Sequence, residues 1–499
     1  MRKKRAVSNI IFGFATQLII IVLGMIVPRL VLVSYGSDTN GFTSTITQIF
    51  TYMALLEAGI AQSTLNSLYE PVAKQDQKQI SRIMSASQRY YRKVTLVYGL
   101  LVVVASFVIP FVINTQIKRT TAIIYILATG ISNVIGFYYL ESWKQLLSAD
   151  GRYYISQIIG MIATILTYII KIILIPYAIS IAWIQVALVG VALIQCFIYK
   201  WYLHKHYSWV DFKAEPDNSA LSDRYNFMKS QIASTIFTST DILLLAIIGS
   251  TLLSSVYAIY NLVFHNLVRL LDAIYFGTIY ILGQSWKARE DAYTIKHDTY
   301  DMVTNWAITA TMSVGYLMVL SFVGLYTNGV SDINYIYKWL PLLFCLTQIL
   351  SYNRYVNGNL LNMAGYASLV GKISIIEAAI NLFGSIILGL NFGIYGVLLA
   401  TVIALPVKVI TCLYVANKKI LKRSVWYSLR ILLTNYILFA GTILYGSFRP
   451  IQASTITDFL CKSILCCIVI FPLYLSVNIL VNHRTVAKCY RWMRRRADK

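Results

Sequence analysis

The sequence is poor in acidic residues and in residues that interrupt helices. Only 20 of its 499 residues are Asp or Glu, and charged residues of both signs make up 13% of the chain, about half the fraction typical of a soluble domain. The 9 prolines are spread thinly along the chain, so long helices can form without frequent breaks. This composition argues against a soluble globular protein.

Sequence signatures of enzymes and of metal centres are also missing. The chain contains no P-loop, no HExxH motif and no GxSxG motif, and its 7 cysteines lack CxxC or Cys/His spacing. Those motifs hold phosphates, metals or nucleophiles through their spacing, so their absence removes the usual basis for such chemistry. We therefore predict that the protein is not an enzyme and that it uses no cofactor and no metal.

What the chain does contain is a series of long apolar segments. Hydrophobic residues make up 58% of it, in runs of about 20 residues or more, the length that a helix needs to cross a bilayer. Barrel strands would instead alternate over about ten residues. We predict an all-α polytopic membrane protein of about 14 transmembrane helices, near 9–34, 42–67, 93–114, 120–147, 153–174, 178–200, 225–249, 252–282, 301–326, 335–361, 366–389, 393–416, 425–447 and 456–481.

The basic residues fall in every second link between these spans. The even-numbered links and the two tails contain 33 of the 43 Lys and Arg residues, which places them on the cytoplasmic side and predicts that both termini are cytoplasmic. The net charge of +23 is dispersed over these links, where it faces anionic membrane lipids. We therefore expect membrane lipids, and no nucleic acid, as partners.

Two short segments recur at nearly the same spacing. Residues 146–153 resemble residues 360–367 at an offset of 214, and residues 35–37 resemble residues 248–250 at an offset of 213. Six spans separate the copies, so both have the same orientation, as in transporters built from parallel repeats. We predict a lobe at 1–210 with spans 1–6, a lobe at 211–420 with spans 7–12, and two further helices with a basic tail at 421–499.

Several charged residues lie inside the predicted spans. A charge at the bilayer centre costs about 2.5–3.5 kcal/mol even on the lenient insertion scale, so each must face a partner or a wet cavity. Arg29 lies near the outer end of its span, where its head group can instead reach the interface. The cations that we single out are Arg29, Arg269, Arg354 and Lys408, and the principal acids are Glu57, Asp241, Asp272 and Glu377.

Polar residues line one face of three predicted helices. They follow helical spacing at Asn261, His265, Arg269 and Asp272 on one span, at Gln231, Thr235, Thr238 and Asp241 on another, and at Gln348, Tyr352, Tyr355 and Asn359 on the third. Such stripes either wall a polar cavity or join helices through hydrogen bonds, and the sequence leaves both interpretations open. His265 is either a proton carrier or a packing residue.

Several motifs resemble those of Wzx-type polysaccharide flippases of the MOP superfamily. Tyr35 and Gly36 with Gly41 and Phe42 are similar to the turn between the first two spans. Glu57 with Gly59 and Ile60, followed by residues 67–71, resembles the end of span 2, although many relatives have Asp where this chain has Glu57. The segments 147–154, 240–242 and 256–261 resemble other links of that family.

The resemblance implies two six-helix lobes, with two extra helices, that move a lipid-linked oligosaccharide across the bacterial plasma (inner) membrane. The carrier is usually undecaprenyl diphosphate, and the product is capsule, O-antigen or exopolysaccharide. A polysaccharide polymerase and chain-length proteins are then possible partners. Arg side chains suit a diphosphate, so we predict Arg29, Arg269, Arg354 and Lys408 as its ligands, and Asn261, Tyr352, Tyr355 and Asn359 as sugar ligands. H⁺ or Na⁺ coupling is assigned to Glu57, Asp241, Asp272, Glu377 or His265.

Three alternatives stay open from the sequence. The first is an ion-coupled multidrug or cation exporter of the same superfamily, although such exporters typically have twelve spans. The second is a membrane glycan polymerase, an enzyme that would need sizeable external loops. The third is an assembly scaffold, for which substitutions of the intramembrane charges would have no effect.

Overall fold

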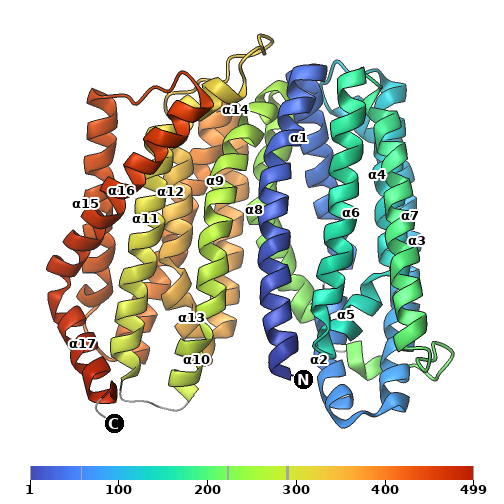
Figure 1. Cartoon of the computed structure of the whole chain (residues 1–499), viewed down its shortest axis with the longest axis horizontal. Coiled ribbons are helices and arrows are strands. Elements are labelled where there is room, and N and C mark those ends of the chain that lie inside the picture. The colour runs from blue at the N-terminus through green and yellow to red at the C-terminus, as the bar shows by residue number, and fades with distance from the viewer. Residues whose placement is uncertain (1, 58, 222–223, 288–291, 498–499) are drawn as a thin grey trace. The chain divides into compact units, whose positions relative to one another are not determined.

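The computed structural model describes residues 2–57, 59–221, 224–287 and 292–497, and Figure 1 shows their course. Within these ranges the chain forms helices joined by short links, with no strand. The chain divides into two compact units, Met1–Ser255 (unit 1) and Val256–Lys499 (unit 2). Each unit is described by itself.

Unit 1 is built from eight α-helices and the first residues of a ninth. Within it α4 packs between α3 and α7, α6 packs on α1 and α7, and α8 packs on α1 and α2. The helices are α1 (Arg2–Met53), α2 (Ile60–Lys74), α3 (Gln77–Val112), α4 (Arg119–Tyr139), α5 (Glu141–Ala149), α6 (Tyr153–Leu174), α7 (Ile181–His206), α8 (Arg224–Ile248) and α9 (Thr251–Thr278), with 3₁₀ turns η1 (Ala54–Leu56), η2 (Ile175–Tyr177) and η3 (Asn218–Leu221).

Unit 2 contains most of α9 and the helices that follow. In it α11 is the central helix and packs on α12, α15 and α16. The helices are α10 (Tyr280–Lys287), α11 (Tyr293–Tyr326), α12 (Leu340–Asn353), α13 (Tyr355–Met363), α14 (Ala367–Tyr414), the π-helical turn η4 (Val415–Ile420), α15 (Trp426–Phe448), α16 (Ile456–Val481) and α17 (His483–Ala497).

The helices have the length and surface of membrane spans. Nine helices of the described part are long and apolar enough to cross a bilayer. Large apolar side chains point outward from them, for example Leu100, Phe107 and Ile437, which are 66%, 56% and 71% exposed. A surface of this kind is compatible with lipid rather than with water. The prediction of an all-helical, multi-pass membrane protein is confirmed.

The number of spans stays a prediction. α1 and α14 are 52 and 48 residues long, and each contains one residue with non-helical backbone angles, Gly36 or Gly393. Conversely, α12 and α13 are each shorter than a span, at 14 and 9 residues. The number of helices therefore does not give the number of spans, because α1 and α14 each contain a turn and other predicted spans are divided into two helices.

Two predicted external links are shorter than expected. We expected links at 36–41 and 390–393, but the residues on either side of Gly36 and Gly393 are helical. Gly36 has φ 84° and Gly393 has φ 57°, a region that glycine enters without steric penalty. At the second turn the chain passes very close to itself, since a Cβ on Gly396 would lie 1.9 Å from the carbonyl oxygen of Leu388.

Three predicted spans are divided by short breaks. The span predicted at 120–147 is broken at Leu140 and the span at 335–361 at Arg354. The segment predicted at 42–67 is interrupted by η1 and by Gly59, which has φ +88°. Gly59 also lies against α8, because a Cβ there would be 2.0 Å from the carbonyl oxygen of Arg224.

The helix bounds recur 214 residues apart. α5 and α13 are both nine residues long and begin at Glu141 and Tyr355, while α3 and α11 end at Val112 and Tyr326. The following turn is repeated bond for bond. The amides of residues 150, 151 and 152 donate to the carbonyls of 146, 148 and 147, and those of 364, 365 and 366 donate to 360, 362 and 361. The lobe boundaries at 210 and 420 remain a prediction.

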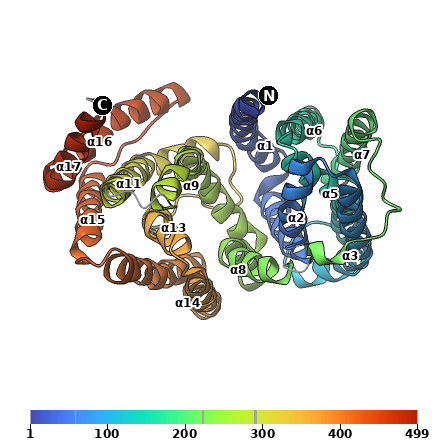
Figure 2. The same ribbon diagram turned by 90° about the horizontal axis from the view of Figure 1, so that it is seen from below.

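The last helices belong structurally to unit 2. Figure 2 shows α15, α16 and α17 along one side of α11. The Tyr474 hydroxyl on α16 lies 2.7 Å from that of Ser313 on α11 and 2.8 Å from that of Thr442 on α15. Polar contacts of this type join helices where the surroundings are apolar. Helices α15, α16 and α17 are thus packed within unit 2.

Candidate functional site

The break between α12 and α13 places an arginine inside unit 2. Arg354 is the one residue between the two helices, with φ −87° and ψ −14°. Its carbonyl accepts a hydrogen bond of 2.8 Å from the Gly358 amide, so it also contributes to the first turn of α13. The side chain is 16% exposed.

Arg354 shares a buried carboxylate with a lysine. Its Nη1 donates a hydrogen bond to Glu377 Oε1, and Lys408 Nζ lies 3.9 Å from Glu377 Oε2. The Glu377 side chain is 3% exposed, whereas those of Arg354 and Lys408 are 16% and 17% exposed. We call these three residues the unit 2 charge cluster.

Helix α14 brings two members of the cluster together. Glu377 and Lys408 lie on either side of the turn at Gly393. The two arms are joined by a 2.8 Å hydrogen bond from Asn381 to Thr401. Lys408 also donates a 2.8 Å hydrogen bond to Ser374, on the arm that carries Glu377. The turn therefore fixes residues that are 31 positions apart in the sequence.

The charge cluster carries an excess of positive charge. One carboxylate cannot neutralise both a guanidinium and an ammonium group, so the three side chains together carry a formal charge of +1. Cations that are removed from water and only partly compensated attract anions strongly. Arg in particular offers paired donors that fit phosphate oxygens. The cluster is chemically suited to an anionic ligand.

A second polar group lies on α9, α12 and α13. The Tyr352 hydroxyl donates a 2.7 Å hydrogen bond to Asp272. The rings of Tyr352 and Tyr355 are stacked, with their centroids 4.5 Å apart. The centroid of the Tyr275 ring lies 5.1 Å from that of Tyr355. Arg269 is near enough to interact electrostatically with Asp272 and His265. The structure thus brings four predicted site residues, Arg269, Asp272, Tyr352 and Tyr355, into one acidic and aromatic group.

The other predicted residues have different surroundings. In unit 2, Asn261 and Asn359 are half-buried on α9 and α13, and His265 is exposed. In unit 1, Arg29 is half-buried on α1, and Asp241 is buried on α8, where it interacts electrostatically with Tyr52. Whether Arg29 acts with the unit 2 cations remains a prediction.

Glu57 belongs to an acidic group of its own in unit 1. It follows η1 and interacts electrostatically with Glu141 and Lys144. Lys144 pairs with Glu141 at 2.5 Å, as oppositely charged residues three apart on a helix can. One lysine thus serves two carboxylates here, the reverse of the balance in the unit 2 charge cluster.

Comparison with known proteins gives matches at the level of structure only. No protein-family model and no curated protein sequence matches the chain. A structure titled lipid II flippase MurJ, inward closed conformation, aligns with TM-score 0.69 and 15% identity over 94% of this chain and 98% of that one. An inward-facing multidrug resistance MATE family transporter of the MOP superfamily aligns with TM-score 0.65 and 12% identity, over 87% of this chain and 99% of that one. A MOP superfamily transporter from Pyrococcus furiosus aligns with TM-score 0.61 and 13% identity, over 89% of this chain and 97% of that one.

The chain has the fold of MOP-superfamily transporters. The identities are low, so the comparison establishes the fold and leaves the transported molecule open. Within this MOP fold the unit 2 charge cluster occurs in one repeat only. At the offset of 214, Arg354 corresponds to Leu140 and Glu377 corresponds to Ala163. The first repeat thus forms the corresponding helices without these charges.

Sequence analysis missed a buried ion pair at one end of this MOP fold. Arg423, just after η4, donates two hydrogen bonds of 2.6 and 2.7 Å to Asp298 on α11. Arg423 also donates to Asn417 at 2.8 Å, and His297 lies 3.3 Å from Asp298. The two partners are 125 residues apart, and each lies among other charges near a link that the sequence predicts to be cytoplasmic, so no spacing in the sequence indicates the pair.

Among the residues that the structure describes, there is no group of three or more His, Cys, Asp or Glu side chains that could hold a metal ion.

Proposed function

We propose that this protein is a flippase that moves an undecaprenyl-diphosphate-linked oligosaccharide from the inner to the outer leaflet of the bacterial plasma membrane by alternating access. The product would be used for capsule, O-antigen or exopolysaccharide synthesis. The observation that carries the proposal is the unit 2 charge cluster, in which Arg354 and Lys408 share the single carboxylate of Glu377. No covalent chemistry is assigned to the protein.

The diphosphate binds by competing with Glu377. In the absence of substrate, the carboxylate keeps the two cations from being buried unpaired, which would cost several kcal/mol. A diphosphate offers more oxygens and more charge than one carboxylate, so it can engage Arg354 and Lys408 together. Release at the other leaflet returns both cations to Glu377. The carboxylate thus makes binding reversible.

The sugars bind the neighbouring tyrosines and amides. Tyr352 and Tyr355 present stacked rings and a hydroxyl, and Asn359 and Asn261 add amide groups on α13 and α9. Aromatic faces with nearby hydrogen-bonding groups suit sugar rings, which have both apolar and polar edges. Arg29 and Arg269 contribute further positive charge along the path of the diphosphate.

An ion gradient drives the cycle. Glu377, Asp272, Glu57 and Asp241 are acids in apolar surroundings, where holding H⁺ or Na⁺ lowers the cost of burial. His265 is a further proton acceptor. Taking up the ion on one side and releasing it on the other biases the two states of the transporter. A polysaccharide polymerase and chain-length proteins would receive the flipped product.

A second candidate is an ion-coupled exporter of organic cations. The similarity to multidrug MATE structures favours it, and so does the group in which Asp272 meets Tyr352 and Tyr355. An acid beside aromatic rings is a usual environment for a cationic ligand. The two candidates make opposite demands, since the flippase uses the cationic cluster and the exporter uses the acidic group.

Transport by the purified full-length chain in liposomes separates them. In one arm, an undecaprenyl-diphosphate-linked glycan carries a fluorophore that a membrane-impermeant reductant bleaches only in the outer leaflet. In the other arm, liposomes with a proton or sodium gradient are loaded with rhodamine 6G. The proposal predicts increased bleaching and no dye efflux. Dye efflux without glycan movement would establish the exporter, and lengthened glycan would reveal a polymerase.

A further inference from the structure

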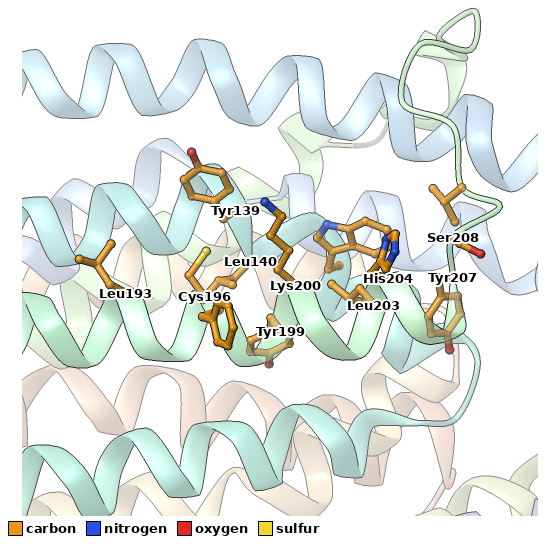
Figure 3. Close-up of a pocket in the computed structure, with 13 residues that line it drawn as sticks. Tyr139, Leu140, Leu193, Cys196, Tyr199, Lys200, Leu203, His204, Tyr207 and Ser208 are labelled. Carbon is orange, nitrogen blue, oxygen red and sulfur yellow. The ribbon is translucent and has the colours of Figure 1, made fainter.

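A groove on unit 1 lies between α7 and the break that joins α4 to α5. Its volume is about 570 Å³. Residues of α7 line it from the C-terminal end of that helix to near its middle. Figure 3 shows Cys196 and Lys200 pointing from α7 toward Tyr139. The lining residues include Leu193, Cys196, Phe197, Lys200, His204 and Ser208. None of the predicted site residues lines this groove.

The groove changes from apolar to basic along its length. Leu193, Cys196 and Phe197 lie toward the middle of α7, whereas Lys200 and His204 lie in its last two turns. These positions recur at three and four residues, so they share one face of the helix. From Leu193 to His204 the helix rises about 16 Å at 1.5 Å per residue, roughly the thickness of one leaflet's hydrocarbon layer.

The polar end lies at the level of the cytoplasmic head groups. Basic residues cluster at this end of α7 and in the link after it, which places it on the cytoplasmic side. Lys200 and His204 are both exposed. The Tyr139 and Phe197 side chains are 52% and 71% exposed, so the groove opens on the outside of unit 1.

We propose that this groove is a binding site for an anionic phospholipid of the cytoplasmic leaflet. Lys200 binds the phosphate, with His204 and the hydroxyl of Ser208 as further polar ligands. An acyl chain lies along Leu193, Cys196 and Phe197. Charge complementarity at one end and apolar contact at the other select an anionic lipid. A free phosphate would gain nothing from the apolar half, and a zwitterionic lipid would gain less from Lys200, because its choline group offsets the charge of its phosphate.

The site is independent of the proposed transport function. It lies in unit 1, outside the unit 2 charge cluster, and it requires no movement of the protein. Helix α7 packs on α4 and α6, so a lipid held between α7 and the α4–α5 break contacts two separate segments of unit 1. We expect the bound lipid to stabilise their packing, because a ligand that binds only the folded state shifts the folding equilibrium.

Alkylation of Cys196 provides a local test, since this thiol lines the apolar end of the groove. The full-length protein is delipidated in a neutral detergent and titrated with phosphatidylglycerol, with phosphatidylcholine of the same chains, or with inorganic phosphate. The rate of N-ethylmaleimide addition at each cysteine is followed by peptide mass spectrometry. Cys489 on α17 serves as an internal reference outside the groove.

The proposal predicts that phosphatidylglycerol slows alkylation of Cys196 and leaves Cys489 unchanged, at concentrations where phosphatidylcholine and phosphate have no effect. Lys200→Gln should raise the phosphatidylglycerol concentration for half protection about fivefold, the effect of one cation near an anionic surface. Lys205→Gln is the matched control, because Lys205 stacks on Trp201 and does not line the groove. Equal protection by both lipids, protection by phosphate alone, or an equal effect of Lys205→Gln would overturn it.

Discussion

Arg354 and Glu377 form an ion pair at a place where the first repeat has two apolar residues. Arg354 sits at the break between α12 and α13 and binds Glu377 on α14. The residues 214 positions earlier are Leu140, at the break between α4 and α5, and Ala163 on α6. The first repeat forms the corresponding helices and turn without these charges, so we expect the charges of unit 2 to have a functional role.

Replacing the whole unit 2 charge cluster by apolar residues should preserve folding. Arg354→Leu and Glu377→Ala restore the residues of the first repeat, and Lys408→Leu removes the remaining cation. Buried ion pairs replaced by apolar groups are often neutral or stabilising, whereas removing one partner costs about 3–5 kcal/mol. We expect the triple variant to unfold within a few degrees of the parent in detergent, as followed by tryptophan fluorescence.

The single variant Glu377→Ala provides the contrast. It leaves two cations with no carboxylate between them, so it should unfold at a clearly lower temperature than the triple variant. If Glu377→Ala were as stable as the parent, the three charges would not form a coupled buried cluster.

The Arg423–Asp298 pair should contribute to the stability of unit 2. Both partners are 12% exposed, and two short hydrogen bonds join them. We expect Arg423→Gln and Asp298→Asn each to destabilise the protein, and the double variant to lose less than the sum of the two. The coupling energy in a double-mutant cycle should fall in the upper part of the usual range of about 0.5–3 kcal/mol. Full additivity would show that the pair contributes no direct interaction.

A pH effect is expected in the link between α7 and α8. The hydroxyl of Ser219 donates a hydrogen bond to Asp217, Gln79 donates another, and Arg82 is nearby, so the pKa of Asp217 lies below its ordinary value of 3.8. A lowered pKa in the folded state means that the ionised form stabilises the link. That contribution is present above pH 3.8 and disappears as the pH falls through the lowered value.

Hydrogen exchange of residues 211–221 in detergent tests this effect. Amide protection should decrease as the pH is lowered below 3.8 in the parent, after correction for intrinsic exchange rates. Asp217→Asn should have lower protection at neutral pH and a weaker pH dependence. Asp211→Asn, in the same link, is the control and should behave like the parent. An unchanged pH dependence in Asp217→Asn would contradict the assignment.

Glycine substitutions should separate backbone strain from close packing. Gly59 and Gly365 both have φ +88°, but only at Gly59 would a Cβ meet backbone atoms, with the Arg224 carbonyl oxygen 2.0 Å away. Gly365→Ala should cost about 1–2 kcal/mol from the left-handed conformation alone. Gly59→Ala should cost distinctly more, because α2 and α8 must also move apart. Similar unfolding temperatures for the two variants would argue against the close approach of these helices.

The sequence predicted the helical framework well because membrane insertion constrains the length of apolar segments and the placement of charged residues. Apolar length and the distribution of Lys and Arg indicate a helical, multi-pass chain, and the two copies of the turn at Gly151 and Gly365 have the same hydrogen bonds in the structure. The sequence did not predict the breaks at Leu140 and Arg354. Neither residue disfavours a helix, so the interruptions arise from tertiary packing.

The candidate site could be predicted only in part. The cost of intramembrane charge singled out Arg354, Lys408 and Glu377, but the shared carboxylate depends on the turn at Gly393, which brings distant residues together. Asp298 and Arg423 were missed for the opposite reason. They lie in or near basic links that the sequence predicts to be cytoplasmic, where charged residues are expected and do not indicate a site.

The most direct test of the account is glycan translocation by the charge-cluster triple variant. Liposomes containing Arg354→Leu/Glu377→Ala/Lys408→Leu are compared with the parent and with Lys418→Gln, an exposed cation just beyond α14. Outer-leaflet bleaching of the labelled undecaprenyl-diphosphate-linked glycan is measured. The account predicts that the triple variant loses translocation while its unfolding temperature and the activity of Lys418→Gln stay near the parent values. Undiminished translocation by the folded triple variant would contradict it.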